Sequence, residues 1–323
     1  MNHSAVLAGL GTCMPGAVIT NAELERRLDT SDDWIVARTG IRERRIARGG
    51  TTVLDLAREA GRCALASAGE EDVQAVVLAT TTPYRPCPAM APELAAQLGL
   101  PGVAAYDISA VCSGALYGIA NAAGLIAAGV AERVLLVCAE TYSTILDPDD
   151  RATAVIFGDG AGAAVLRRGD PSEKGAILAL DLGSDGRQAE LIARDPDTGH
   201  FRMDGSAVYR MAARTFCATA RQVLAKTGWS VDDVHAYVPH QANQRITDAV
   251  VKELGLTPQA AVSNIDKVGN TSAASILLAL ADGSRAGRPA AGHRTLLAAM
   301  GGGLTWGSAT LVWPQLDALS VEL

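Results

Sequence analysis

The chain lacks an excess of basic residues. Its 323 residues include 28 Lys and Arg against 35 Asp and Glu, for a formal net charge of −7. Nonspecific nucleic-acid binding needs basic surface that displaces counterions from phosphates, so we expect no nucleic-acid partner. With 49% hydrophobic and 20% charged residues, the composition is typical of a globular chain with a large core. An anionic partner must therefore meet a local cluster of Lys or Arg.

Metal-binding, disulfide and secretion patterns are also missing. The six cysteines, at positions 13, 63, 87, 112, 138 and 217, form no Cys-x-x-Cys pair, and no His-Glu-x-x-His occurs. These absences argue against a zinc site and a disulfide framework. The N-terminus has no basic region followed by an apolar stretch, so no signal peptide is predicted. We expect a cytoplasmic protein, because free cysteines fit a reducing compartment.

One apolar run, residues 114–131, is long enough to suggest a membrane span. It consists mostly of Ala and Gly with few large side chains, which favours a buried helix, so we expect no membrane association. Gly114 and Gly118 share one face of that helix. Each glycine costs about 0.8–1 kcal/mol relative to Ala in a helix interior. We therefore expect another element to pack closely against this face.

Strand-like and helical segments alternate along the chain, which predicts an α/β fold. The second half echoes the first: residues 234–238 resemble 76–80 at a separation of 158, Asn270 lies 158 after Cys112, and 294–299 resemble 133–138 at 161. A duplicated unit is the simplest account. We expect halves at 1–168 and 175–323, joined by the charged segment 167–175, with 183–206 as irregular loop.

The cluster Gly158-Asp-Gly160-Ala-Gly162 is not a dinucleotide site. A dinucleotide fingerprint opens a helix and is followed by an acidic residue about 20 positions later, whereas Ala-Ala-Val-Leu follows here and predicts a strand. We therefore interpret these glycines as a turn and expect no redox cofactor.

Cys112 lies where a polar, strand-like approach meets the Ala- and Gly-rich helix. A free cysteine is more often an inert core residue. The N-terminus of a helix, however, stabilises a thiolate and lowers the thiol pKa from about 8.5. We therefore predict that Cys112 is a nucleophile and that the other cysteines, Cys87 aside, only pack.

Two later motifs supply polar partners for Cys112. They are Pro239-His240-Gln-Ala-Asn243 and Gly269-Asn270-Thr-Ser-Ala-Ala-Ser275, and neither contains Asp or Glu. A site without carboxylates tolerates an anion. One consistent chemistry is carbon–carbon bond formation between thioesters: Cys112 takes an acyl group, and His240 and Asn270 donate hydrogen bonds to a malonyl thioester carbonyl as carbon dioxide leaves. No metal or cofactor is required.

Several motifs together resemble the β-ketoacyl-acyl-carrier-protein synthase III family, which has the thiolase fold. They include Ser31-Asp-Asp-Trp34-Ile-Val-Ala-Arg38-Thr-Gly-Ile-Arg, Phe157-Gly-Asp-Gly-Ala-Gly, Gly301-Gly-Gly-Leu-Thr-Trp-Gly-Ser and the three segments above. The resemblance implies two pseudo-symmetric halves in an α-β-α-β-α layered core. It also implies an acyl-CoA primer, an acidic acyl-carrier protein and a homodimer. The reaction it implies is decarboxylative condensation to a 3-oxoacyl-carrier protein.

The same resemblance assigns roles to individual residues. It implies a catalytic triad of Cys112, His240 and Asn270, with an oxyanion hole at the backbone N–H groups of Cys112 and Gly302. The remaining assignments are coenzyme A binding by Trp34, Arg38, Arg151 and Asn243, carrier-protein docking by Arg210, Arg245 and Lys252, and an acyl pocket at Cys87, Ala115 and Met300. Family members often have aromatic residues at these three pocket positions, so we expect a primer larger than acetyl. The helix after Asn270 is expected to break at Asp282-Gly283.

Several alternatives stay open. Cys, His and Asn in this order also occur in papain-like proteases, but the Gly-Ser-Cys-Trp neighbourhood of that family is absent. An enzyme of the same fold could move an acyl group from Cys112 to a natural-product acceptor without condensation. A condensing enzyme of this family could also be a specialised variant that supplies a polyketide starter unit. A non-catalytic subunit of this fold would lack the triad, which this chain keeps.

Overall fold

A computed structural model describes residues 3–69 and 72–323. Two sheets form its framework. The six-stranded sheet has the order β14 (Leu319–Glu322), β1 (Ser4–Met14), β7 (Asp159–Gly169), β6 (Arg133–Thr141), β4 (Ala75–Ala79) and β5 (Ala104–Ile108). The four-stranded sheet has the order β11 (Ala236–Pro239), β12 (Arg294–Gly301), β13 (Thr305–Val312) and β8 (Ile177–Ser184). Short pairs join β2 (Val18–Thr20) with β3 (Glu43–Arg45) and β9 (Ile192–Arg194) with β10 (Phe201–Met203).

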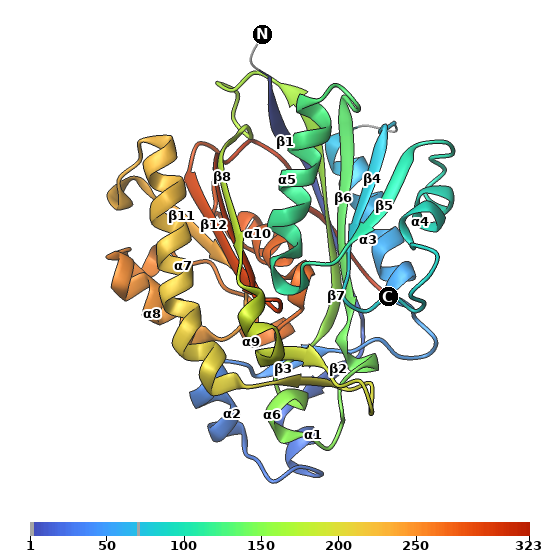
Figure 1. Cartoon of the computed structure of the whole chain (residues 1–323), viewed down its shortest axis with the longest axis vertical. Helices are drawn as coiled ribbons and strands as arrows, with labels where there is room; N and C mark the ends of the chain where they lie inside the picture. The colour runs from blue at the N-terminus through green and yellow to red at the C-terminus, as the bar shows by residue number, and fades with distance from the viewer. Residues whose placement is uncertain (1–2, 70–71) are drawn as a thin grey trace.

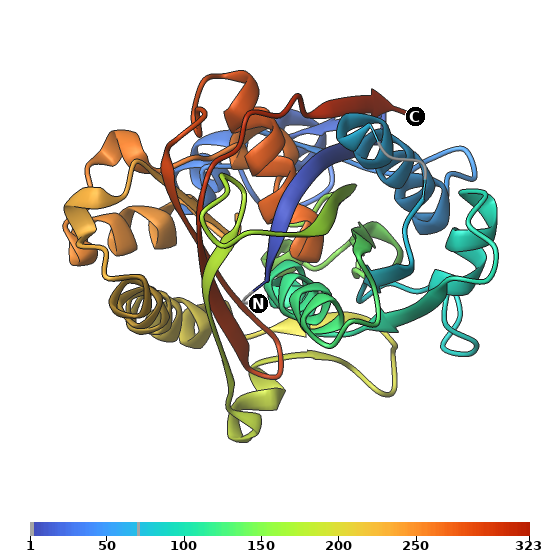
Figure 2. The same ribbon diagram turned by 90° about the horizontal axis from the view of Figure 1, so that it is seen from above.

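The helices form layers on and between these sheets (Figures 1 and 2). Helices α5 (Gly114–Ala127) and α10 (Ser275–Arg285) lie between the sheets, and α3 (Val53–Ala68) covers the outer face of the first, next to α4 (Ala91–Gln97). Helices α7 (Gly205–Thr227) and α8 (Gln244–Leu254) cover the second sheet. This confirms the predicted five-layer α/β fold. The short helices α1 (Asn21–Glu25), α2 (Asp32–Thr39), α6 (Arg151–Ala154) and α9 (Ile265–Val268) gather at one end.

Local sequence explains where the long outer helices begin and end. Thr52 and Asp55 form a reciprocal capping box at the start of α3, and Gly69 ends it in the left-handed conformation. Asp204 caps α7, and Gly228 at φ +69° ends it. None of the described helices combines the length and hydrophobicity that crossing a bilayer requires. The run 114–131 instead forms α5, which ends at Ala127 and lies in the core between the sheets.

Equivalent elements of the two halves are 161 residues apart. Val111 begins the 3-10 turn η1 (Val111–Ser113) and Ser272 begins η6 (Ser272–Ala274), which gives 272 − 111 = 161. Strands β6 and β12 give the same value, as do β4 and β11. The separation of 158 predicted for the first strand and for Asn270 is wrong by three residues, because apolar runs do not mark strand boundaries sharply. The counterpart of Cys112 is therefore Ala273.

Glycines in the core allow close approach of neighbouring elements. A Cβ on Gly118 would lie 2.3 Å from Leu136 Cδ1, and one on Gly162 would lie 2.5 Å from Leu277 Cβ. The first contact confirms the predicted close packing on α5. The second corrects the predicted turn at 158–162, because β7 begins at Asp159 and its glycines let α10 pack against the strand.

Two further predictions about local structure are wrong. The segment 183–206 is not only loop, since it contains the 3-10 turn η3 (Gly186–Leu191), the β9–β10 hairpin and the start of α7. Helix α10 continues through Asp282 and Gly283 to Arg285. A Cβ on Gly283 would lie 2.3 Å from the Arg288 carbonyl oxygen, so this glycine accommodates the returning chain rather than breaking the helix.

Candidate active site

Cys112 sits on a strained turn between β5 and α5. The preceding residue, Val111, has a φ of +48°, which is rare for a β-branched residue and typical of positions held by surrounding structure. The Cys112 side chain is 7% exposed. The end of β12 lies directly against this turn, because a Cβ on Gly301 would be 2.7 Å from the Cys112 backbone nitrogen. The turn thus fixes the thiol just before the first residue of α5.

The resting thiol is not the thiolate that the sequence suggested. Burial, with a smaller contribution from the charge of Glu140, raises the pKa of Cys112 to about 12, although a hydrogen bond with Ser272 acts in the lowering direction. The helix-start position is as predicted, but desolvation of a fully enclosed thiol outweighs the helix dipole. Cys112 is therefore a protonated thiol at neutral pH and must lose its proton during any acyl transfer.

Asn270 and Ser272 approach Cys112 from the second half. Asn270 follows α9, and its backbone N–H donates to the Ile156 carbonyl. Its side-chain Oδ1 accepts a hydrogen bond of 2.8 Å from the Ser272 backbone N–H. This contact orients the carboxamide through its oxygen and leaves Nδ2 as its remaining hydrogen-bond donor. Because η6 packs against η1, the Asn270 segment reaches the Cys112 turn.

His240 follows β11, and its backbone N–H donates to the Ala298 carbonyl of β12 at 2.8 Å. The ring is 2% exposed, and its Nδ1 has no hydrogen-bond partner among the described residues. Burial lowers the pKa of His240 to about 3. The imidazole is therefore neutral at physiological pH, where it can donate one hydrogen bond but accepts a proton poorly.

The three predicted motifs meet at one end of the central layer. Strands β11 and β12 are parallel neighbours, so His240, which follows β11, and Gly301, the last residue of β12, lie at the same edge of the sheet. Gly301 touches the Cys112 turn from one side, and η6 with Ser272 touches it from the other. Gly302 continues from Gly301 and lies against Ile192. Fold symmetry thus brings sequence-distant polar groups to one thiol.

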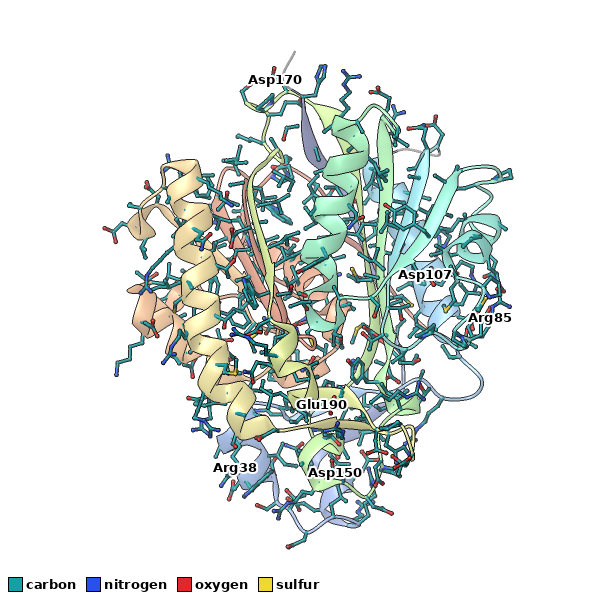
Figure 3. The ribbon with its side chains drawn as sticks, in the orientation of Figure 1. Arg38, Arg85, Asp107, Asp150, Asp170 and Glu190 are labelled. Carbon is teal, nitrogen blue, oxygen red and sulfur yellow. The ribbon has the colours of Figure 1, made fainter. Side chains whose placement is uncertain are left out.

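A cavity of about 470 Å³ lies near the end of the molecule where Arg38 and Asp150 are labelled in Figure 3, and its lining includes Asn243 of the His240 motif and Ile156, whose carbonyl accepts from the Asn270 N–H. The Trp34 ring has the guanidinium carbons of Arg38 and Arg151 at 4.8 and 5.0 Å from its centroid. Asn243 Nδ2 donates to the Arg38 carbonyl at 2.9 Å. Three arginines and no acidic side chain are among the described residues that line the cavity. This lining suits an aromatic ligand that carries negative charge.

Comparisons with known proteins agree along the length of the chain. Residues 106–186 match the family model of 3-oxoacyl-[acyl-carrier-protein] synthase III, and residues 224–313 match the model of its C-terminal part. A β-ketoacyl-[acyl-carrier-protein] synthase III of Streptomyces coelicolor is 54% identical over 96% of this chain and 94% of its own length. The chain belongs to the β-ketoacyl-[acyl-carrier-protein] synthase III family. Enzymes of this family condense an acyl-CoA with malonyl-acyl-carrier protein, a reaction of the acyltransferase class.

Solved structures of synthase III proteins have the same fold. The Pseudomonas aeruginosa 3-oxoacyl-(acyl carrier protein) synthase III is 51% identical and superimposes with a TM-score of 0.95 over 97% of this chain and 99% of that one. The priming β-ketosynthase of the R1128 polyketide biosynthetic pathway is 34% identical, with a TM-score of 0.91 over 96% of each chain. The thiolase fold predicted from the motifs is confirmed.

The three residues predicted to dock a carrier protein do not all lie at the same place in this synthase III. Arg210 and Arg245 line the Trp34 cavity, and the Arg245 guanidinium lies 5.0 Å from the Tyr209 ring centroid. Lys252 is exposed in the last turn of α8. The two arginines therefore stand at the cavity, with Lys252 farther along the same helix as Arg245.

The residues predicted for the acyl pocket lie in different places. Ala115 has no exposed surface and follows the first residue of α5, and Met300 is 5% exposed next to Gly301 on β12. Both are near the Cys112 turn along their own elements. Cys87 is instead exposed on the loop between β4 and α4. Within one subunit, Cys87 is a surface residue.

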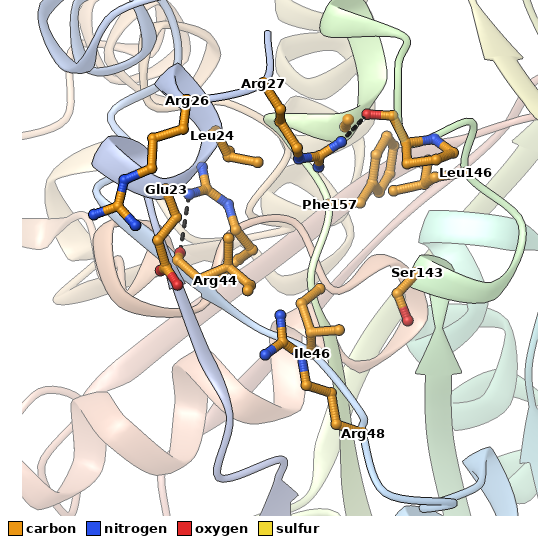
Figure 4. Close-up of a pocket in the computed structure, with 13 residues that line it drawn as sticks. Glu23, Leu24, Arg26, Arg27, Arg44, Ile46, Arg48, Ser143, Leu146 and Phe157 are labelled. Carbon is orange, nitrogen blue, oxygen red and sulfur yellow. Dashed lines mark hydrogen bonds between the residues drawn. The ribbon is translucent and has the colours of Figure 1, made fainter.

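A second cavity, of about 500 Å³, lies near α1 (Figure 4). Its wall includes Arg26, Arg27, Arg44 and Arg48, with Glu23 as the only acidic side chain among the described lining residues. The Phe157 ring lies at its apolar side and stacks on Tyr142 at a centroid distance of 4.5 Å. These arginines form a local cluster of positive charge in a chain whose net charge is −7.

Sequence reasoning missed Glu140, Ser272 and Tyr142 around the thiol. All three are buried. Glu140 and Ser272 shift the pKa of Cys112, and Tyr142 OH lies 3.4 Å from the Ser272 hydroxyl oxygen. Ser272 lies inside the motif Gly269–Ser275 that contains Asn270, so the sequence alone places it in the same segment as a predicted catalytic residue. Glu140 is the second-last residue of β6, a strand whose residues from Val134 to Ala139 are all apolar. A lone carboxyl in such a run is the signal that could have identified it.

Proposed function

We propose that Cys112 carries the acyl primer of this synthase as a thioester. The thiol attacks the carbonyl carbon of an acyl-CoA, the carbon–sulfur bond to coenzyme A breaks, and coenzyme A leaves. The N–H groups of Cys112 and Gly302 would hold the developing oxyanion. Each such donor lowers the barrier by about 2.7–4 kcal/mol. The close contact between Gly301 and the Cys112 backbone supports this assignment.

In the second half-reaction, malonyl-acyl-carrier protein loses carbon dioxide and its enolate attacks the acyl-Cys112 carbonyl. His240 and Asn270 would donate hydrogen bonds to the enolate oxygen. A neutral His240 is suited to this role, since burial lowers its pKa to about 3. The hydrogen bond that anchors Asn270 Oδ1 leaves its Nδ2 free for the same oxygen. No metal or redox cofactor takes part in these steps.

The Trp34 cavity is the proposed site for the nucleotide end of coenzyme A. The Trp34 ring would stack on adenine, Arg38 and Arg151 would pair with phosphates, and Asn243 would hold this wall in place. Arg210, Arg245 and Lys252 would meet an acidic carrier protein near the same opening. The absence of acidic side chains among the described residues of the cavity lining supports both assignments.

We propose that two subunits pair along β5. This strand is the edge of the six-stranded sheet and has β4 as its one strand neighbour, so its outer backbone groups are available to another strand. The Cys87 loop is held beside this edge, because Asp107 on β5 accepts hydrogen bonds from the Met90 and Ala91 N–H groups (Figure 3). Pairing would bring Cys87 toward the partner's acyl pocket, where Ala115 and Met300 leave room for a primer larger than acetyl.

The proposed division into halves at 1–168 and 175–323 follows the two sheets, with β14 returning to the first. The protein would work in the cytoplasm, as its free cysteines suit. Similarity to a priming β-ketosynthase of a polyketide pathway supports a starter-unit role.

The observation that carries this proposal is the packing of Gly301 and of the Asn270 segment against the Cys112 turn, with the Gln241 N–H next to His240 donating to the Ser275 hydroxyl of that segment. It is tested by assaying 3-oxoacyl-carrier product from malonyl-acyl-carrier protein with a panel of acyl-CoAs. His240→Ala and Asn270→Ala should retain acylation of Cys112 but lose decarboxylation by 10²-fold or more. Loss of acylation with normal decarboxylation in both variants would contradict the assigned roles, and exclusive use of acetyl-CoA would contradict the larger pocket.

A further inference from the structure

A buried carboxyl group lies beside Cys112 without a cation to neutralise it. Glu140, in β6, has no solvent exposure. Among residues 3–69 and 72–323, no Lys or Arg forms a salt bridge with it. Buried charges are normally paired, because burial without a partner is costly. A buried carboxyl group without a cationic partner does not stabilise the fold, so we looked to the function of the site for the reason that Glu140 is there.

Only one Glu140 oxygen is fully engaged. Oε2 accepts hydrogen bonds from the Thr81 N–H at 3.0 Å and the Thr82 hydroxyl at 2.8 Å. Oε1 makes no aligned hydrogen bond with a described residue. Burial raises the pKa of Glu140 to about 7, and the Thr81, Thr82 and Ser272 groups lower it in part. The carboxyl group is thus held in place with one oxygen ready to accept a proton.

Ser272 connects this carboxyl group to the thiol. Its hydroxyl lies near Tyr142, with 3.4 Å between the two oxygens. The η6 turn that carries Ser272 packs against both η1, which carries Cys112, and β6, which carries Glu140. In keeping with this packing, hydrogen bonding to Ser272 lowers the pKa of Cys112 and the pKa of Glu140, both of which burial raises. The Ser272 backbone is fixed at φ +47°. A hydroxyl both donates and accepts, so rotation about one bond can pass a proton from sulfur to carboxylate.

Acyl transfer to Cys112 needs a proton acceptor that His240 does not provide. The thiol has a pKa of about 12 and the imidazole a pKa of about 3, both because of burial. The other titratable groups facing Glu140 are Cys138 on its own strand and Tyr142 on η2 (Tyr142–Thr144), and burial raises both of their pKa values above neutrality. Within this cluster of described residues, Glu140 alone changes charge near neutral pH.

We infer that Glu140 accepts the Cys112 thiol proton, through the Ser272 hydroxyl, as the acyl group moves from coenzyme A to sulfur. The inference rests on the proposed role of Cys112 as nucleophile. The S–H bond breaks, the thiolate forms the new carbon–sulfur bond, and the coenzyme A thiolate that leaves takes a proton from solvent. Glu140 does not touch the substrate, so it is a positioning residue for this proton.

The second half-reaction returns the proton. When the enolate attacks acyl-Cys112, the carbon–sulfur bond breaks and sulfur leaves as a thiolate. Protonated Glu140 returns its proton through Ser272, and the resting thiol and carboxylate are restored. Glu140 is therefore neutral throughout the life of the acyl-enzyme, when a buried charge beside the thioester would be least favourable.

The test is the pH dependence of Cys112 acylation, followed by the mass of the intact protein after mixing with an acyl-CoA the enzyme uses. The wild-type rate should rise with pH and level off near pH 7. Glu140→Gln should acylate at least tenfold more slowly at pH 7.5, with no levelling near 7, and Ser272→Ala should behave the same way. Asp159→Asn is the matched control, since Asp159 is another buried acid with a raised pKa, bonded to Ser143 and Ala47 instead.

Purely electrostatic behaviour gives the opposite result. The Glu140 charge raises the Cys112 pKa, so if that were its only effect, Glu140→Gln would acylate faster than wild type above about pH 7, where Glu140 is charged. Faster acylation, or an unchanged profile in both variants, overturns the relay. Iodoacetamide reacts with the Cys112 thiol without binding at the coenzyme A site. The rates of Cys112 alkylation should therefore show the same pH profiles in wild type and in both variants as the rates of acylation. A wild-type protein that gains no acyl mass would instead remove the nucleophile itself, so the two failures are distinguishable.

Discussion

Val111 and Ser272 hold the same left-handed backbone conformation on either side of Cys112, at φ +48° and +47°. They occupy equivalent positions in the two halves, at the first residues of η1 and η6. Neither is a glycine, so both positions carry backbone strain of about 1–3 kcal/mol. The duplicated fold thus places two strained turns against each other, one with the thiol and the other with the hydroxyl that reaches it.

Relief of this strain can be measured at Val111. Val111→Gly and Val111→Ala both remove the side chain, but only glycine adopts φ +48° freely. We expect the glycine variant to have an unfolding free energy about 1 kcal/mol above that of the alanine variant, by urea denaturation. Equal stabilities would show that the turn relaxes without cost.

The contact between Gly301 and Cys112 predicts a specific loss of activity. A Cβ at Gly301 would lie 2.7 Å from the Cys112 nitrogen and 3.1 Å from the Ser113 nitrogen, so Gly301→Ala must displace the nucleophile turn. Acylation should fall tenfold or more. Gly124→Ala is the control, because no heavy atom lies within 4 Å of its added Cβ; it should keep full activity. Normal acylation by Gly301→Ala would argue against a fixed turn.

The Trp34 cavity predicts a change in substrate binding rather than in chemistry. Trp34→Ala should raise the KM for acyl-CoA about tenfold with little change in the maximal acylation rate, because stacking is lost far from sulfur. Trp229→Ala is a matched control, since Trp229 also carries an arginine, Arg294, at 5.3 Å from its ring centroid. Equal effects of both substitutions on KM would place coenzyme A elsewhere.

The raised pKa of Glu140 predicts a pH-dependent stability. A carboxyl that titrates near 7 when folded and near its ordinary 4.5 when unfolded favours the folded state at low pH, and this contribution is lost as pH rises from about 4.5 through about 7. From pH 5 to 8.5, wild type should lose about 2–3 kcal/mol of unfolding free energy relative to Glu140→Gln. Parallel pH profiles for the two proteins would mean that Glu140 is not desolvated as described.

Much of the architecture follows from local sequence pattern. The alternation of apolar strands and helices, the duplication, and the meeting of the Cys112, His240 and Asn270 segments depend on periodicity and order along the chain. The pairing of Trp34 with Arg38 also follows from spacing, since residues four apart in a helix are neighbours.

What the sequence did not reveal depends on burial. A helix-start cysteine is expected to be acidic, yet enclosure by both halves raises the Cys112 pKa to about 12. Gly283 was predicted to end a helix because the sequence does not show that the Arg288 carbonyl packs against it. Glu140 differs from an ordinary glutamate only because the fold buries it away from solvent, which raises its pKa to about 7. In each case the deciding contact comes from a distant part of the chain.

The mass of the intact protein after incubation with mixed acyl-CoAs tests the central claim most directly. Wild type should gain one acyl group, mapped to Cys112, and lose it when malonyl-acyl-carrier protein is added. Cys112→Ala should gain none. Acyl mass on the Cys112→Ala protein, or on another residue of the wild type, would contradict the account.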